Sequence, residues 1–262
     1  MTVPVYRRGG NLPPAKTGIS QSTKLCEAKG MVTIIQVSGR QEIMSVEEKT
    51  QQITDFHCAL LSAIADLVEF RDNCTGRHIS RTQEYLKALV EQLIKDCVYS
   101  DELLHWDINV ILISSQLHDI GKIAISDDIL NKPGKLTSEE FEIMKTHTQK
   151  GVDALEKTES SAYFTVVLEH AKQFAGTHHE KWDGSGYPYG LSGLDIPLEG
   201  RIMAIADVYD ALMTVRPYKK AFTADESAQI IVGGAGTHFD PAIAKAFEKL
   251  KSDFAAIAMN YE

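Results

Sequence analysis

Several histidines and aspartates in this chain lie beside or within apolar segments, where hydrophobic packing does not require them. The pair His118-Asp119 closes a strongly apolar run, and His178-His179 precedes a glycine-rich loop. Asp207 lies within the apolar segment RIMAIADVYDALM, where burying a carboxylate without a partner costs free energy. Each of these residues alone is ordinary, since most single histidines on helices serve the core or the surface. Together they need a shared partner, and a metal ion that accepts imidazole and carboxylate ligands supplies one.

Seven side chains carry donor atoms suited to such ions: His78, His118, Asp119, His147, His178, His179 and Asp207. A single catalytic ion leaves a position open for water or substrate and uses only about three to five ligands. The set therefore predicts two ions, with Asp119 as the bridge because its two oxygens can each bind one. Two adjacent ions lower the pKa of a water that they share, hold a phosphate group and stabilise the leaving oxygen. The pattern thus favours cleavage of a phosphodiester by metal-activated water.

The elements that must position these side chains are helices. Ser45 and Glu48 form a capping box that predicts a helix through Asp72. Its apolar residues recur at three- and four-residue spacing: Ile53, Phe56, Leu60, Ile64 and Leu67. Later helix starts are marked by acidic first turns, two more capping boxes and an N-terminal proline: Ser100, Thr137 with Glu140, Thr223 with Glu226, and Asp240 with Pro241. No long alternating strand pattern follows residue 45, so we predict an all-α, compact helical bundle.

Residues 1–44 differ in character from the rest. They are rich in glycine and proline and contain one β-prone stretch, MVTIIQV, at 31–37. An isolated strand is rarely stable alone. We interpret 1–44 as a short, irregular and flexible N-terminal arm with one short strand, and 45–262 as the catalytic domain.

Charge and composition exclude several classes of partner. The net charge of −9 argues against a DNA or RNA partner, which would require a basic face. A small phosphate-bearing ligand stays compatible, because bound metal ions can reverse the local field. No apolar run is long enough to span a membrane, the N-terminus lacks a secretory apolar segment, and the four cysteines are scattered. The expected location is cytoplasmic, without membrane attachment.

Four ordered segments resemble the HD-GYP subgroup of the HD-domain metal-dependent phosphohydrolases: HDIGK (118–122), HTQKG (147–151), HHEKWDGSGYP (178–188) and IADVYDAL (205–212). The resemblance covers roughly residues 50–255. It implies a helical HD domain, all seven ligands named above, and iron or manganese as the usual metal. It also implies hydrolysis of cyclic di-GMP to linear pGpG and onward to GMP.

The resemblance further assigns roles to individual residues. Asp119 and Lys122 are implied as catalytic, with Lys122 contacting a phosphate group. The implied substrate-binding residues are Lys122, Gly186, Tyr187, Pro188, Asp210, Arg216 and Lys219. One position departs from the family pattern: Cys74 stands four residues before His78, where an acidic residue is common. We therefore predict two ions rather than three, with Cys74 a bystander or a weak thiolate ligand.

Other functions stay open at this point. Another cyclic dinucleotide such as cyclic GMP-AMP is a close variant of the substrate. A phosphohydrolase acting on a different nucleotide is less consistent with the intact Gly186-Tyr187-Pro188 triplet. A non-catalytic dinucleotide-binding adaptor would tolerate the loss of ligands, whereas all seven are retained. Either a homodimer or a complex with a signalling-protein partner is compatible with the sequence.

Overall fold

The chain divides into two units, and the boundary along the sequence falls between Gln52 and Ile53. The computed structural model describes residues 33–37, 40–71, 77–158, 162–214 and 221–261. The first unit contains an antiparallel pair of strands, β1 (Thr33–Val37) and β2 (Arg40–Met44), with Thr33 opposite Met44. The predicted strand at 31–37 contains β1. The prediction did not include β2, because RQEIM lacks the run of β-branched residues that marks β1.

Helix α1 (Val46–Arg71) begins at the predicted capping box. The Ser45 hydroxyl accepts a hydrogen bond from the Glu48 amide at 3.1 Å, and the Glu48 carboxylate accepts one from the Ser45 amide at 2.8 Å. This reciprocal pair satisfies two amide groups that a helix start otherwise leaves unbonded.

The named secondary-structure elements described in the second unit are all helices, as predicted. Its main helices are α2 (His78–Lys95), α4 (Ile108–Ser115), α6 (Ser138–Glu156), α7 (Ala162–Thr177), α8 (Leu198–Met213), α9 (Ala224–Gly233), α10 (Pro241–Lys249) and α11 (Lys251–Asn260). Short α3 (Ser100–Leu103) and α5 (Asp127–Leu130) and the 3-10 turns η1 (Ile120–Ala124) and η2 (Gly193–Asp195) connect them. No described helix combines the length and the apolarity needed to cross a membrane.

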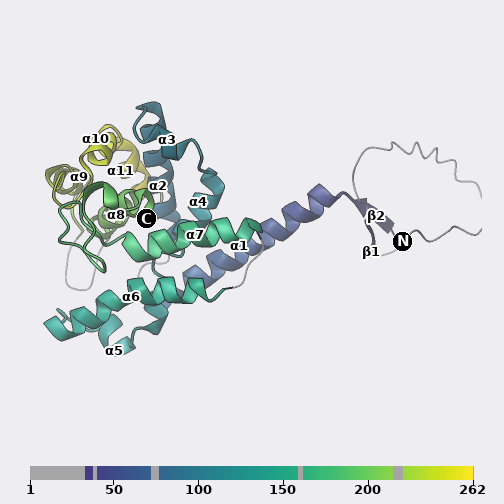
Figure 1. Cartoon of the computed structure of the whole chain (residues 1–262), viewed down its shortest axis with the longest axis horizontal. Coiled ribbons are helices and arrows are strands. Elements are labelled where there is room, and N and C mark those ends of the chain that lie inside the picture. The colour runs from purple at the N-terminus through teal and green to yellow at the C-terminus, as the bar shows by residue number, and fades with distance from the viewer. Residues whose placement is uncertain (1–32, 38–39, 72–76, 159–161, 215–220, 262) are drawn as a thin grey trace, which may run out of the picture. The chain divides into compact units, whose positions relative to one another are not determined.

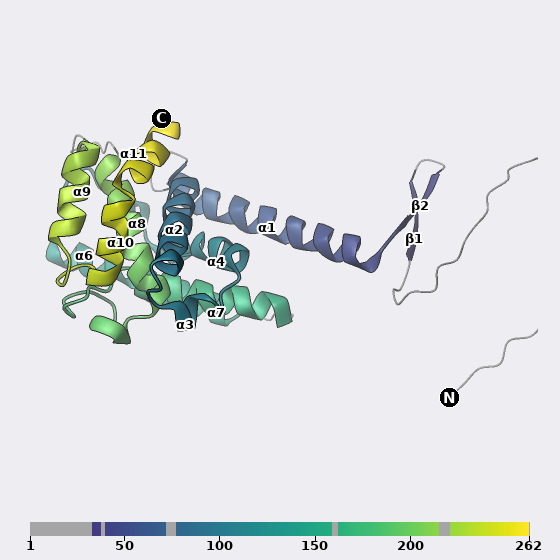
Figure 2. The ribbon, with the colours of Figure 1, turned by 90° about the horizontal axis from the view of Figure 1, so that it is seen from above.

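Helix α8 lies at the centre of the larger core, where it packs against α2, α7 and α9 (Figure 1). Helices α9, α10 and α11 gather at one end of the unit beside α2 (Figure 2). Aromatic side chains fill this end: the Tyr85 ring stacks on Phe254 at 4.5 Å between centroids, and Tyr209 meets Phe254 edge-on. The core thereby fixes α2 and α8, which carry His78 and Asp207.

A smaller core holds the remaining histidine-bearing elements. Its buried residues come from the α4–η1 turn, α6 and α7: Leu117, Leu155, Leu168, Ala171 and Ala175. Turn η1 packs directly on α6, and a Cβ atom at Gly121 would lie only 1.9 Å from the His147 carbonyl oxygen. Glycine is therefore required at this approach, which places the His118-Asp119 turn against the helix that carries His147.

The predicted helix caps are present where they position site elements. Thr137 and Glu140 bond reciprocally at the start of α6, and Thr223 and Glu226 do the same at α9. Asp240 caps α10, with a proline at the first helical position.

Candidate metal centre

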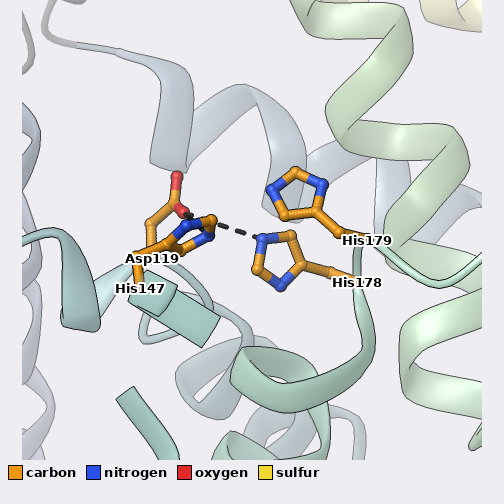
Figure 3. A group of neighbouring side chains, drawn as sticks. All are labelled: Asp119, His147, His178 and His179. Carbon is orange, nitrogen blue, oxygen red and sulfur yellow. Dashed lines mark ion pairs between the residues drawn. The ribbon is translucent and has the colours of Figure 1, made fainter. Parts of the chain in front are cut away.

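Asp119 stands between two groups of metal-binding side chains. One group contains Asp119, His147, His178 and His179, and the other contains Asp119, His78 and His118. In each group the donor atoms lie within 4.8 Å of one another. Figure 3 shows the first group converging from separate elements, with Asp119 before η1, His147 on α6 and the histidine pair after α7. Six of the seven predicted ligands are thus brought together around one carboxylate.

Three imidazoles are fixed in orientation by hydrogen bonds to backbone carbonyl oxygens. Nδ1 lies 2.9 Å from the Ser115 oxygen in His118, 2.7 Å from the Met144 oxygen in His147, and 2.8 Å from the Phe174 oxygen in His178. Because a carbonyl only accepts, Nδ1 carries a proton in each ring, so in the neutral ring Nε2 holds the lone pair. This is the tautomer in which Nε2 can bind a metal.

The inward-facing atoms of these rings have no hydrogen-bond partner among the described residues. Four buried atoms lack such a partner: Nε2 of His118, Nε2 of His147, Nε2 of His178 and Oδ1 of Asp119. Leaving several buried acceptors unsatisfied costs free energy at each atom. Divalent cations satisfy such a donor set of imidazole nitrogens and carboxylate oxygens. The residues therefore fit the divalent metal that this type of domain requires.

The two oxygens of Asp119 face different sets of partners. Oδ1 lies 3.3 Å from Nε2 of His147 and 3.7 Å from Nε2 of His178. Oδ2 lies 3.4 Å from Nε2 of His118 and 2.7 Å from Nζ of Lys122. One carboxylate therefore presents an oxygen to each side, which is the arrangement a bridging ligand needs.

The charge states of these groups suit ligand chemistry. Although burial opposes ionisation of Asp119, Lys122 and His118 hold the pKa of its carboxyl well below the usual range. Burial lowers the pKa of His147 to about 4 and that of His179 well below its ordinary value. At neutral pH these imidazoles are therefore uncharged, and Asp119 is ionised.

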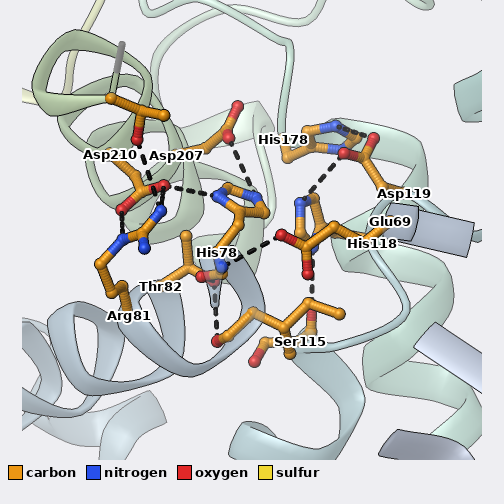
Figure 4. Close-up of polar contacts among 12 residues, drawn as sticks. Glu69, His78, Arg81, Thr82, Ser115, His118, Asp119, His178, Asp207 and Asp210 are labelled. Carbon is orange, nitrogen blue, oxygen red and sulfur yellow. Dashed lines mark hydrogen bonds and ion pairs between the residues drawn. The ribbon is translucent and has the colours of Figure 1, made fainter. Parts of the chain in front are cut away.

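His78 is held from behind by a buried ion pair (Figure 4). Its Nδ1 lies 2.7 Å from Oδ2 of Asp210, and Asp210 is in turn bound by Arg81 through two contacts of 2.6 and 2.9 Å. The Glu69 carboxylate accepts a hydrogen bond from the His78 amide at 3.0 Å. A carboxylate behind a ligating histidine fixes its ring and raises its basicity. Asp207 lies on the other side, with Oδ1 3.6 Å from Nε2 of His78.

Sequence reasoning did not select Arg81 or Glu69. The signal for Arg81 was present: His78 and Arg81 are three residues apart on one helix, as are Asp207 and Asp210 on another. Residues at this spacing share a helix face, so two such pairs can meet across an interface. Glu69 carried no comparable local signal, because its contact depends on how α1 and α2 meet.

The glycine-rich loop is organised around Glu180, a buried residue that the sequence prediction also missed. Its carboxylate accepts hydrogen bonds from the amides of Tyr189 at 2.7 Å and Leu191 at 3.1 Å. A Cβ atom at Gly186 would lie 2.3 Å from the backbone nitrogen of Lys181, so only glycine fits there. The Tyr187 ring, held in this loop, lies 4.8 Å from the His179 ring between centroids. The loop therefore forms one wall of the centre.

The predicted substrate-binding residues fall into three situations. Lys122 contacts Asp119, and the Tyr187 ring lies beside that of His179. Gly186 packs against the backbone of Glu180 and Lys181, and Pro188 is exposed. Asp210 is buried behind His78 with both oxygens bonded. Arg216, Lys219 and also Cys74 lie outside the described residues.

The family model of the HD domain matches residues 62–243. The chain therefore belongs to the HD-domain family of metal-dependent proteins. Within that family, its ordered motifs and its relatives identify it with the HD-GYP group predicted from the sequence.

Curated relatives agree with this grouping. The chain is 47% identical to a cyclic di-GMP phosphodiesterase of Vibrio cholerae, over 85% of this chain and 45% of the relative. It is 38% identical to a cyclic di-GMP phosphodiesterase of Thermotoga maritima, over 81% of this chain and 54% of that protein. A 3′3′-cGAMP-specific phosphodiesterase of Vibrio cholerae is 34% identical to the chain, over 88% of this chain and 45% of the relative. The chain spans about half the length of these relatives.

A solved structure shares the fold. The crystal structure of a cyclic GMP-AMP-specific phosphodiesterase of Vibrio cholerae aligns with a TM-score of 0.51 at 17% sequence identity, covering 78% of this chain and 52% of that one. This likeness supports the helical architecture.

Proposed function

We propose that this domain hydrolyses cyclic di-GMP to linear pGpG, and onward to GMP, with two divalent ions that share Asp119. The observation that carries the proposal is the pair of donor groups joined at this one carboxylate. Relatives named as cyclic di-GMP phosphodiesterases, with 47% and 38% identity to the chain, support the choice of substrate. Iron or manganese is the metal that we propose, because the resemblance to the HD-GYP group implies them and a donor set of imidazole and carboxylate suits both.

When bound, the two ions would lower the pKa of a shared water and hold the phosphate group. The protein supplies orientation and charge. The backbone bonds of His118, His147 and His178 keep three Nε2 atoms directed inward before substrate arrives. In this proposal Lys122, which lies beside Asp119, would balance charge that develops on a phosphate oxygen. Such fixed groups need no rearrangement during the reaction, which lowers the barrier.

The remaining contacts belong to the same proposal. Lys122, Gly186, Tyr187, Pro188, Arg216 and Lys219 are the proposed substrate contacts. The bonded surroundings of Asp210 favour positioning of His78 over direct contact with substrate. A centre of two ions, a cytoplasmic location, and a homodimer or signalling-protein partner complete the proposal.

A second substrate has specific support. A relative specific for 3′3′-cGAMP is 34% identical over 88% of this chain. We therefore propose cyclic GMP-AMP as the alternative. The two substrates differ in one base, so the base-contacting residues decide between them.

The test is product analysis with protein loaded anaerobically with iron or manganese and given each dinucleotide separately. We expect pGpG or GMP from cyclic di-GMP at a higher kcat/KM than from cyclic GMP-AMP. Asp119→Ala should lower turnover more than about 100-fold, because it removes the shared ligand. Asp253→Ala, an exposed aspartate on α11, is the matched control and should leave turnover unchanged. Full turnover by Asp119→Ala would refute the proposed centre.

A further inference from the structure

Helix α1 carries an apolar stripe that faces solvent. Its members alternate at spacings of three and four residues: Ile53, Phe56, Leu60, Ala63, Leu67 and Phe70. These six residues are called the α1 stripe below. All are exposed, with Phe56 at 65%, Leu67 at 68% and Phe70 at 85% of full exposure. Exposed apolar patches of this extent mark interaction sites.

The opposite face of α1 is already occupied by the helical unit. Ala65 and Val68 are buried, and Leu61 packs against the smaller core. The Ser62 hydroxyl donates to the Gln116 side chain at 2.8 Å. At the end of the helix, Arg71 donates to two backbone carbonyl oxygens and to Asp127. These contacts fix the rotation of the helix, so the α1 stripe is directed away from the core.

We propose that the α1 stripe binds the α1 stripe of a second copy of this chain in a two-helix coiled coil. Alternation of three and four residues, an average near 3.5, keeps apolar side chains facing another helix along its length. A helix covered by a globular surface shows a broader stripe with a period near 3.6. Because twofold symmetry brings identical surfaces together, one stripe provides both sides of the contact.

The positions beside the stripe are compatible with self-association. They are Gln52, His57, Ala59, Ile64, Asp66 and Arg71. Only one acid and one base stand among them, with one histidine. A second copy therefore meets no row of like charge in either relative direction of the helices, and Ile64 widens the apolar contact. Like charges at these positions would oppose pairing.

The surface available is sufficient for a specific contact. A phenylalanine buries about 150–250 Å² and an aliphatic side chain about 60–120 Å² when fully covered. At the observed exposures, two copies together could cover roughly 1,000 Å² of side-chain surface. That area reaches the lower limit of about 1,000 Å² for a biological interface.

Sedimentation equilibrium of the full, metal-loaded chain tests this proposal. We expect a dimer for the unmodified protein. Leu60→Glu combined with Leu67→Glu should raise the dimer dissociation constant about 100-fold or more, because it removes four apolar side chains from the paired helices and adds charge. Ile230→Glu replaces an exposed apolar residue on α9, away from the stripe and its flanking positions, so it should leave the dimer intact.

Circular dichroism and metal content should be unchanged in all variants, because the replaced side chains are exposed. A loss of dimer with these two readouts intact supports the stripe as the interface. A chain that is monomeric at about 100 µM, a concentration far above the Kd of a specific dimer, would overturn the proposal and assign the stripe to another segment or protein. A dimer that persists in the double variant would also overturn it.

Discussion

At the residue scale, the site is defined by atoms that lack a partner. In His118, His147 and His178, Nδ1 bonds to a backbone carbonyl oxygen, and the buried Nε2 has no hydrogen-bond partner among the described residues. Burial keeps His147 neutral, and its pKa is about 4. His147 therefore stays neutral and can bind a cation as a ligand at neutral pH. The low pKa of His147 should make the stability of the metal-free protein depend on pH.

The stability of the metal-free protein should fall between pH 6.5 and pH 4 through His147. Above pH 6.5 this histidine is neutral in both states. As the pH falls below about 6.5, only the unfolded chain gains the proton, so the free energy of unfolding decreases until pH 4 is passed. The loss attributable to His147 is up to about 3 kcal/mol. Urea unfolding at pH 7.5 and pH 5 should show a smaller loss for His147→Gln than for the unmodified chain. Equal losses in the two proteins would contradict the assignment.

Asp210→Asn should weaken metal binding by the His78 group. The substitution keeps the shape but removes the charge that Arg81 and His78 share. We expect a roughly 10- to 100-fold loss of metal affinity, as for other partners of ligating histidines. Metal titration measures this, with Asp225→Asn on the exposed first turn of α9 as control. Unchanged metal affinity together with a raised KM would instead assign Asp210 to the substrate.

At the element scale, helix packing brings distant motifs together. Turn η1 approaches α6 so closely at Gly121 that no side chain fits. This contact sets the spacing between the His118-Asp119 turn and His147. The HDIGK segment is thus both a source of ligands and a packing element.

Gly121→Ala should destabilise the domain by about 3 kcal/mol and lower its metal content. The added Cβ would meet two backbone atoms, the His147 oxygen at 1.9 Å and the Gly151 nitrogen at 2.5 Å, so the helix must move. Gly233→Ala is the control, because a Cβ there meets nothing within 4 Å. That change should be neutral or stabilising by up to about 1 kcal/mol. Equal stability of the two variants, measured by urea unfolding, would show that the close approach is not maintained.

Sequence patterns predicted where helices begin better than which face of a helix packs against the core. Capping boxes at Ser45, Thr137 and Thr223 mark local hydrogen bonds, so they could be recognised directly. The periodicity of α1 predicted the helix but could not show which face meets the core. The core uses small residues such as Ala65, whereas the large ones are exposed.

The sequence predicted the candidate metal ligands well, but it predicted less well the residues that hold those ligands in place. Histidine and aspartate are chemically distinctive, and six of the seven chosen residues meet around Asp119. Arg81, Glu69 and Glu180 were missed because charged residues of these types are common on surfaces. Their roles arise only when the folded chain brings them beside His78 or the glycine-rich loop.

At the scale of the whole molecule, the candidate metal centre and the α1 stripe lie on different elements. The metal centre lies where α2, α6, α8 and the turns around Asp119 and His178 meet, whereas the α1 stripe lies on a helix edge that carries none of the ligands. Loss of the proposed dimer would therefore leave the ligands in place. Assembly and turnover can be measured separately.

The most direct test of the central claim is turnover of cyclic di-GMP as a function of the metal bound per chain. Metal-free protein is loaded stepwise with iron or manganese, and metal and product are quantified on the same samples. If the two groups around Asp119 act together, product should rise steeply only as the second ion binds, and a chelator should abolish it. Full turnover at one ion per chain, or none at two, would contradict a shared two-ion centre.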